Sequence, residues 1–365
     1  MRRIIYTLVM AVCISACGPS LQPVTLHAEI SIPERLSDWH VVYADGRRLT
    51  FNDGVIPYEI NMPLFSDYAL KLRTAWLPEG KAASWREDGE FEFPVGTILS
   101  KTFHYQYGDT GFRKLDAETE LARDGSLNLD KHRIVETRLL VRHDDGWKAY
   151  PYVWNDAQTE AFLEIAGAAF EFSFDDENFV YIVPDTNQCA SCHVPDFTTK
   201  EIRPLGPKAP QLNRLFVYVD GAQNQIERWI DTDRLKEPDI PPSRVPRWSE
   251  RDREDADDVV RAYLDSNCAH CHNPDGSADT SALDLSQNAE MNRAFGVCKP
   301  PVAVGRGSGN RPYDIFPGKP EQSILLYRME HDDPAIMMPE LGRAVAHDEA
   351  VQLIRVWIAN LPGDC

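Results

Sequence analysis

The sequence lacks several features that mark large classes of proteins. No apolar run approaches the ~20 residues that a membrane-spanning helix needs, since the longest run, residues 4–14, has 11 residues. Basic residues are scarce, with 38 Lys and Arg against 57 Asp and Glu. The net charge of −19 repels nucleic acid, and it either keeps the protein soluble or steers it toward a basic redox partner. We therefore expect neither a membrane-spanning nor a nucleic-acid-binding protein.

Common functional motifs are also missing. Apart from two short cysteine motifs, the chain has no internal repeat and no low-complexity tract. Neither His331 nor His347 belongs to an HExxH zinc motif, and the glycine-rich residues 305–309 lack the strand and helix that frame a phosphate-binding loop. Hydrophobic residues make up 43 % and charged residues 26 % of the 365 residues, which indicates a globular protein of two or three domains rather than a disordered chain.

The first 17 residues are typical of a bacterial lipoprotein signal peptide. Two arginines precede the apolar run, and the segment Ile14–Cys17 (Ile-Ser-Ala-Cys) resembles a lipobox, in which the cysteine is lipidated and becomes the new N-terminus. Gly18 follows instead of Asp, which by this resemblance implies the outer membrane. The alternative is a plain signal peptide with an incidental Cys17. Residues 18–36, which contain three prolines, are expected to form a tether.

Residues 37–184 are predicted to form an antiparallel, β-sandwich-like domain. The clearest hairpin runs from Ile134 to Trp154, where alternating apolar residues flank the turn Asp144–Gly146. The segments Phe91–Leu99 and Lys101–Tyr107 are rich in the aromatic and β-branched residues that strands favour.

The remainder is predicted to be a mainly α-helical cytochrome region. We divide it into residues 185–250, which hold the first cysteine motif, and residues 251–365, which hold the second. Helices are expected at Asn224–Leu235, at Asp252–Ser266, and from Asp348 to Leu361, where apolar residues repeat at i, i+3, i+4 and i+7.

Two C-x-x-C-H motifs carry the strongest chemical signal in the chain. This pattern is the attachment signature of c-type haem, because two thiols on one helical turn can reach both vinyl groups of a porphyrin and the next histidine then lies under the iron. We therefore expect two covalently bound haem c groups. The residues that would bind them are Cys189, Cys192 and His193 in the first motif and Cys268, Cys271 and His272 in the second.

Two other chemistries use paired cysteines. Four thiols in two C-x-x-C pairs can bind one zinc ion, and a single pair can act as a redox dithiol. Zinc does not require a histidine after each pair, and the gap between Cys192 and Cys268 is long for a zinc ribbon. A dithiol site is normally single. Haem is therefore the favoured interpretation.

The context of the second motif resembles a class I cytochrome c domain. A predicted helix precedes the motif, and a loop, a Met-Pro pair and a terminal amphipathic helix follow it. By this resemblance Met338 gives its thioether to the second iron, with Met337 as the rival ligand, and Tyr263 and Trp357 form the contact between the first and last helices. A His/Met pair closes the iron to outside ligands, which suits electron transfer.

The first motif has no comparable context. No methionine lies between His193 and the second motif, so the sixth ligand of the first iron comes from elsewhere or is absent. An open position would allow ligand binding or peroxide chemistry. The candidate ligands are His40, Met62, His104, His132, His143, His331 and His347, although each is more simply explained as a core or surface side chain.

The remaining cysteines form one pair. The chain has eight cysteines, of which Cys13 leaves with the leader, Cys17 is expected to carry lipid, and four belong to the haem motifs. An oxidising compartment favours a disulfide between Cys298 and Cys365, but sequence alone does not show that they are close enough to bond.

Most of the mature chain resembles an uncharacterised family of exported diheme c-type cytochromes with a β-rich N-terminal region. The residues that carry the resemblance are Pro63–Ala69, Glu136–Leu140, Gln211–Arg214 and Asn267–His272. The resemblance implies a parallel β-helix repeat protein as a candidate partner, and no established activity. The sequence thus favours electron transfer between redox partners in the cell envelope. The alternatives are a peroxidase- or oxidase-like enzyme with an open first haem, and a binding module whose β-rich domain recognises a surface polymer.

Overall fold

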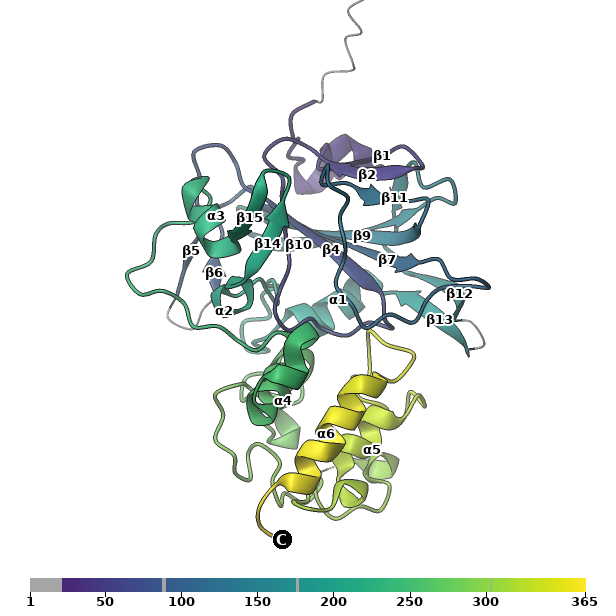
Figure 1. Cartoon of the computed structure of the whole chain (residues 1–365), viewed down its shortest axis with the longest axis vertical. Coiled ribbons are helices and arrows are strands. Elements are labelled where there is room, and N and C mark those ends of the chain that lie inside the picture. Colours follow the sequence, from purple (N-terminus) through teal and green to yellow (C-terminus); the bar gives the residue numbers. More distant parts are fainter. Residues whose placement is uncertain (1–21, 87–89, 175–176, 303) are drawn as a thin grey trace, which may run out of the picture.

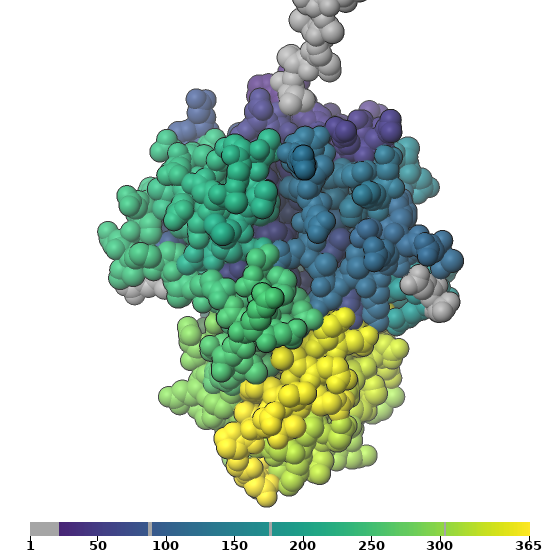
Figure 2. Space-filling view, viewed as in Figure 1, coloured from purple at the N-terminus to yellow at the C-terminus, as the bar shows by residue number. Residues whose placement is uncertain are grey.

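The computed structural model describes residues 22–86, 90–174, 177–302 and 304–365. The predicted signal peptide and the lipidation site Cys17 lie outside these residues. Figure 1 shows a large β-rich part and, beneath it, a smaller lobe that contains the last three helices. Figure 2 shows that the two parts meet directly, with the C-terminal helix of the lobe reaching the β-rich part. Among the described residues, no helix is long and apolar enough to cross a membrane.

The β-rich part is built on a six-stranded antiparallel sheet with the order β11-β10-β9-β7-β4-β3. The expected hairpin is part of this sheet, and Gly146 pairs with His143 across its turn. The strands of this sheet are β3 (Ile56–Tyr58), β4 (Leu70–Trp76), β7 (Ile98–Gln106), β9 (His132–His143), β10 (Gly146–Trp154) and β11 (Ala161–Leu163).

Smaller sheets surround the large one. A three-stranded sheet is formed by β1 (Val42–Ala44), β2 (Arg48–Phe51) and β8 (Leu127–Asn128). The hairpins are β5 (Ser84–Trp85) with β6 (Phe91–Glu92), β12 (Ala168–Phe174) with β13 (Glu177–Val183), and β14 (Leu215–Tyr218) with β15 (Gly221–Asn224). In the segment Phe91–Leu99, which is rich in residues that strands favour, only the two ends lie in strands, in β6 and at the start of β7.

Six α-helices follow or interrupt these strands. They are α1 (Thr186–His193), α2 (Ala209–Leu212), α3 (Gln225–Asp231), α4 (Ala256–Leu264), α5 (Ile324–Glu330) and α6 (Asp348–Asn360). Asp255 caps α4 by accepting hydrogen bonds from the backbone of Asp257 and Asp258, which explains why this helix begins later than Asp252. Trp248–Arg253 forms a separate 3-10 turn before it.

The predicted fold class, a β-sandwich-like domain followed by a mainly α-helical region, is wrong. Helices α4, α5 and α6 contain 9, 7 and 13 residues, so most of residues 251–365 form loops and short turns. Residues 185–250 even contribute a β-hairpin, β14-β15. The physical reason is visible in the loop between α4 and α5, where Leu285, Phe295 and Ile315 fill the core from non-helical backbone.

The core of the C-terminal lobe joins α4 and α6 with side chains from outside the lobe. Val259, Tyr263, Ile354 and Trp357 are buried together, and Met62 from the β-rich part belongs to the same cluster. Tyr263 and Trp357, the expected contact pair, belong to the same buried cluster, and α4 and α6 lie against each other. The Trp357 indole donates to Asp257 at 2.9 Å, while the Tyr263 ring contacts the rings of Trp248 and His347.

Candidate functional site

The first C-x-x-C-H motif forms most of helix α1. Asp185 caps this helix, because its side chain accepts from the backbone of Gln188 while the Gln188 side chain accepts from the Asp185 backbone. The helical turn brings Cys189 and Cys192 to the same side. His193 ends the helix, and its Nδ1 lies 2.8 Å from the Arg203 carbonyl oxygen. This contact leaves Nε2 free for a metal, which is the usual arrangement of a ligating histidine.

The second motif follows α4 through a widened helical turn, Asp265–Ala269. The backbone of Cys271 and of His272 bonds to the Cys268 carbonyl at 3.1 and 2.9 Å, so the motif also forms a compact turn. The His272 Nδ1 lies 3.1 Å from the Ser281 hydroxyl, which again leaves Nε2 free. The Nδ1 atom of each motif histidine thus has a protein partner, and of the two histidines only His193 lines the large cavity described next.

The structure brings the two motifs, 75 residues apart in the sequence, into contact. The Cys271 sulfur lies 3.9 Å from the Ser191 carbonyl oxygen, and the Phe197 backbone donates to the Asp275 carbonyl at 2.9 Å. Both motifs face one cavity of about 870 Å³. Its wall includes Cys189, Cys192, His193, Cys268 and His270, together with apolar side chains from the large sheet. This volume falls in the upper part of the ~300–1,000 Å³ range of cofactor pockets.

The four motif cysteines form no disulfide, and burial raises the pKa of each thiol. Burial raises the pKa of Cys192 to about 11 and that of Cys268 to about 12, so both remain protonated at neutral pH. A redox dithiol needs a lowered thiol pKa, and these values oppose that interpretation. The thiols also do not gather around one point, because the metal-ligand clusters of the described residues include none of them. Zinc binding by the four cysteines is therefore not supported.

The two methionines that the sequence offers as distal ligands, Met337 and Met338, lie in one loop of the C-terminal lobe. Met337 and Met338 both line the cavity, and Met337 is buried. The buried Arg343 holds their loop by donating to the Met338 carbonyl at 2.9 and 3.1 Å and to the His331 carbonyl at 2.8 Å. The sequence-based search did not single out Arg343, because a buried arginine with only backbone partners leaves no pattern in the sequence.

Two of the seven proposed ligands for the first iron line the cavity. These are Met62, which also belongs to the core of the C-terminal lobe, and His347, which bonds to Tyr263. The other candidates do not line the cavity, although the Tyr150 partner of His143 does. His40 contacts Thr25, His104 contacts Thr119 and the ring of His132, His143 contacts Tyr150, and His331 packs on Tyr327.

The cavity contains one further imidazole, which the sequence-based search missed because it lies inside the second motif. His270 is partly buried, and its Nδ1 has no hydrogen-bond partner among the described residues. Burial lowers the pKa of His270 to about 4, so the ring is neutral at physiological pH.

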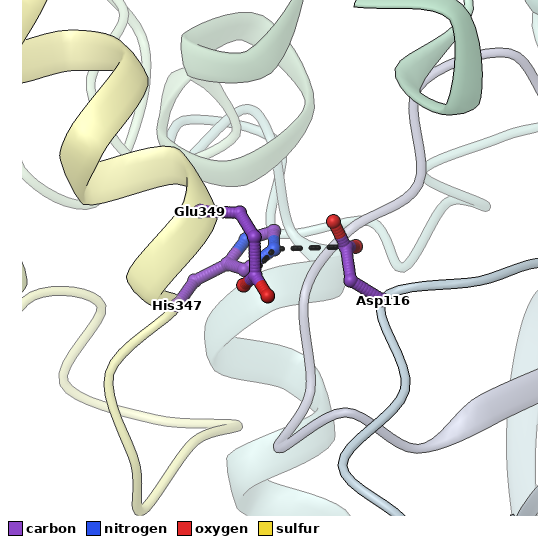
Figure 3. A group of neighbouring side chains, drawn as sticks. All are labelled: Asp116, His347 and Glu349. Atoms are coloured by element: carbon purple, nitrogen blue, oxygen red, sulfur yellow. Dashed lines mark ion pairs between the residues drawn. The ribbon is translucent and has the colours of Figure 1, made fainter.

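A second polar cluster connects the β-rich part to the C-terminal lobe. Figure 3 shows the His347 ring between the carboxylates of Asp116 and Glu349. Its Nε2 lies 3.4 Å from Asp116 and 3.8 Å from Glu349, and its Nδ1 lies 3.0 Å from the Tyr263 hydroxyl. The two carboxylates and the imidazole are close enough to one another to hold a metal ion.

Other contacts of this cluster oppose a metal. The Asp116 carboxylate already accepts from the Trp248 indole at 2.6 Å and pairs with Arg251 at 3.1 Å. Burial raises the pKa of Asp116, but the neighbouring His347, the Trp248 indole and the Arg251 guanidinium together outweigh it and hold the pKa below its usual value. A cation would have to displace these partners beside a guanidinium. The cluster is therefore better explained as a hydrogen-bonded clamp between the two parts.

The leftover cysteines are joined in the structure. Cys298 and Cys365 form a disulfide with a Cα–Cα distance of 5.4 Å, which closes a loop with a sequence separation of 67. This bond ties the C-terminus that follows α6 to the long loop of the lobe. It leaves the four motif thiols as the only free cysteines among the described residues.

Comparisons with known proteins do not assign this chain to a family. The chain matches no protein-family profile, no curated protein and no solved structure.

Proposed function

We propose that this protein is a diheme c-type cytochrome that transfers electrons between redox partners in the bacterial cell envelope. The observation that carries the proposal is the convergence of both C-x-x-C-H motifs on one cavity, with the two motifs in contact at Cys271 and Ser191. A zinc site or a dithiol would explain neither the two histidines with free Nε2 atoms nor the large cavity between the motifs and the sheet.

The two motifs supply the thiols and imidazoles that two haem c groups require, and the first motif has its two cysteines and its histidine on the cavity wall. Cys189 and Cys192 would bind one porphyrin and Cys268 and Cys271 the other, through thioether bonds formed by their thiols. His193 and His272 would hold the two irons through Nε2, since Nδ1 of each is engaged by the protein. Each haem would supply a one-electron iron couple.

The surroundings favour electron transfer over reaction chemistry at the second motif. Met338 and Met337 line the same cavity, and Arg343 fixes their loop through the Met338 carbonyl. A thioether held in place in this way would close the second iron to outside ligands. Contact between the motifs would allow an electron to pass between the two haems without leaving the protein.

The proposed location and partners rest on the sequence. Signal peptide cleavage and lipidation at Cys17 would anchor the protein to the cell envelope, at the outer membrane. The net charge of −19 would attract a basic redox partner, and the family resemblance adds a parallel β-helix repeat protein as a candidate partner.

The test is a haem count on protein made in a host that attaches c-type haem. We expect two haems per chain in a pyridine haemochrome assay, and one haem in each of the single variants His193→Ala and His272→Ala or in variants that lack one cysteine pair. Rapid oxidation of the reduced protein by an external electron acceptor would support transfer. A chain with no covalent haem would contradict the proposal.

One observation favours a second candidate, a haem enzyme with an open first iron. The part of the cavity wall that β7, β9 and β10 supply contains no Met or His side chain. If neither Met62, His270 nor His347 ligates the first iron, small molecules such as peroxide could bind there. Carbon monoxide added to the reduced protein distinguishes the two functions, because half of the haem absorbance would shift for one open iron and none for two closed irons.

A further inference from the structure

Three basic side chains form one row across the large sheet. The register places Arg73 on β4 directly opposite Lys101 on β7, and Lys101 directly opposite Arg138 on β9. These three strands are adjacent in the sheet (Figure 1). All three side chains line the large cavity. Like charges directly opposite each other on neighbouring strands destabilise a sheet, so this row needs compensating negative charge.

The protein supplies that charge to the outer two members of the row. Arg73 donates to Glu59 at 3.0 Å, and both groups are buried. Arg138 binds both oxygens of the fully buried Glu136, at 2.5 and 2.7 Å. Two carboxylates thus form ion pairs with two of the three cations.

Lys101, the central member, has no carboxylate partner and no hydrogen bond among the residues that the structure describes. The Nζ of Lys101 lies 5.8 Å from the centroid of the Phe103 ring. The guanidinium of Arg138 lies closer to the same centroid, at 4.3 Å. Burial, reinforced by Arg73 and Arg138, lowers the pKa of Lys101 to about 7. A primary amine in this position is a strong candidate to receive an anion inside the cavity.

The row faces the first C-x-x-C-H motif. Arg73, Lys101 and Arg138 line the same cavity as Cys189, Cys192 and His193. A group attached to the first motif would therefore lie against this part of the sheet. A porphyrin attached there would bring two propionate carboxylates, which are the anions that such a row would bind.

We propose that Lys101, between Arg73 and Arg138, is the binding site for a propionate carboxylate of the haem attached at Cys189 and Cys192. This inference rests on the proposed function. It assigns a role to the β-rich domain, whose sheet would seat the first haem and set its reduction potential. A cation at a propionate disfavours the ferric state, because the oxidised haem carries one more positive charge than the reduced haem. Lys101 would therefore raise the potential of the first haem and leave the second unchanged.

The test compares the midpoint potentials of the two haems in the purified diheme protein. Lys101→Gln removes the charge and is expected to lower the potential of one haem only, while Lys101→Arg keeps the charge and retains the wild-type value. The exposed Lys131 provides the matched control, and Lys131→Gln should leave both potentials unchanged. Should Lys101→Gln give too little mature protein, Lys101→Leu serves as a second neutral variant that has no ligating atom. It is expected to fold because it removes a like charge from the row.

The outcomes distinguish a failure of this inference from a failure of the proposed function on which it rests. A haem count of two in every variant, with unchanged potentials in Lys101→Gln, would overturn the propionate site and leave the cytochrome intact. Unchanged potentials would also be expected if Lys101 binds a free carboxylate that the assay does not contain, and this case too would overturn the propionate site. A Lys101→Gln protein that gains carbon monoxide binding at the first iron would also overturn the proposal, because it would show that Lys101 ligates the iron itself. A wild-type chain without haem would refute the proposed function instead.

Discussion

Replacing Arg343 by Met should both destabilise the C-terminal lobe and release the proposed ligand loop. The guanidinium of this buried residue donates to the backbone carbonyls of Met338, His331 and Arg328 at 2.8–3.1 Å and to that of Val345 at 3.3 Å. It forms no ion pair with a carboxylate among the described residues. Met fills a similar length but donates nothing, so these carbonyls would lose their charged partner together.

The magnitude follows from these hydrogen bonds. A hydrogen bond to a charged group contributes about 1.5–3 kcal/mol. The total is smaller than the sum, because water can reach some of the carbonyls and because burying a guanidinium is itself costly. We expect a loss of about 2–4 kcal/mol, which corresponds to a melting temperature lower by roughly 5–10 °C. The exposed Arg306, whose side chain is 73 % accessible, is the control, and Arg306→Met should change stability by less than about 0.5 kcal/mol.

The assay combines thermal unfolding with carbon monoxide binding to the reduced protein. Arg343→Met should melt earlier and should also bind carbon monoxide at the second haem, since the loop that carries Met338 loses its support. An Arg343→Met protein with the melting temperature of the Arg306→Met control would refute the argument that this side chain holds the loop.

Three further predictions concern other parts of the structure. Met338→Ala should open the second iron, so that carbon monoxide shifts about half of the reduced haem absorbance, while Met337→Leu should not; the reverse pattern would assign Met337 as the ligand. Hydrogen bonds from two arginines outweigh burial and lower the pKa of Glu118 to about 2, so its contribution to stability is present above about pH 4.5 and is lost as the pH falls toward 2. Glu118→Gln should therefore cost about 2 kcal/mol at pH 7 and almost nothing near pH 2 in urea unfolding, and an equal cost at both pH values would contradict the assigned charge interaction. Cys298→Ser opens a loop with a sequence separation of 67 and should lower the free energy of unfolding by about 4 kcal/mol, an effect that dithiothreitol should reproduce in the wild-type protein but not in the variant.

The sequence predicted local structure best where the pattern is regular. The hairpin of β9 and β10 and the terminal helix α6 lie where alternation and helical periodicity place them. The mainly α-helical C-terminal region is the main error. Its long loop carries apolar residues such as Phe295 and Ile315 without any period, and their burial depends on tertiary packing that no local pattern encodes.

The sequence predicted the cysteines and histidines of the candidate site but not their surroundings. The C-x-x-C-H spacing identifies the thiols and histidines directly, because the chemistry of haem attachment fixes that spacing. The contact between the motifs and the row formed by Arg73, Lys101 and Arg138 depends instead on strand register and chain topology. In the sequence, Lys101 is indistinguishable from an ordinary strand residue. Only its neighbours across the sheet, Arg73 and Arg138, show that it lacks a counter-charge.

The most direct test of the central claim is covalent haem counting by mass spectrometry and pyridine haemochrome spectra on the mature protein. The account predicts a mass increase of two haems per chain, with one haem lost when the cysteines of either motif are replaced. A chain that carries no haem, or that binds zinc through the four motif thiols, would contradict it.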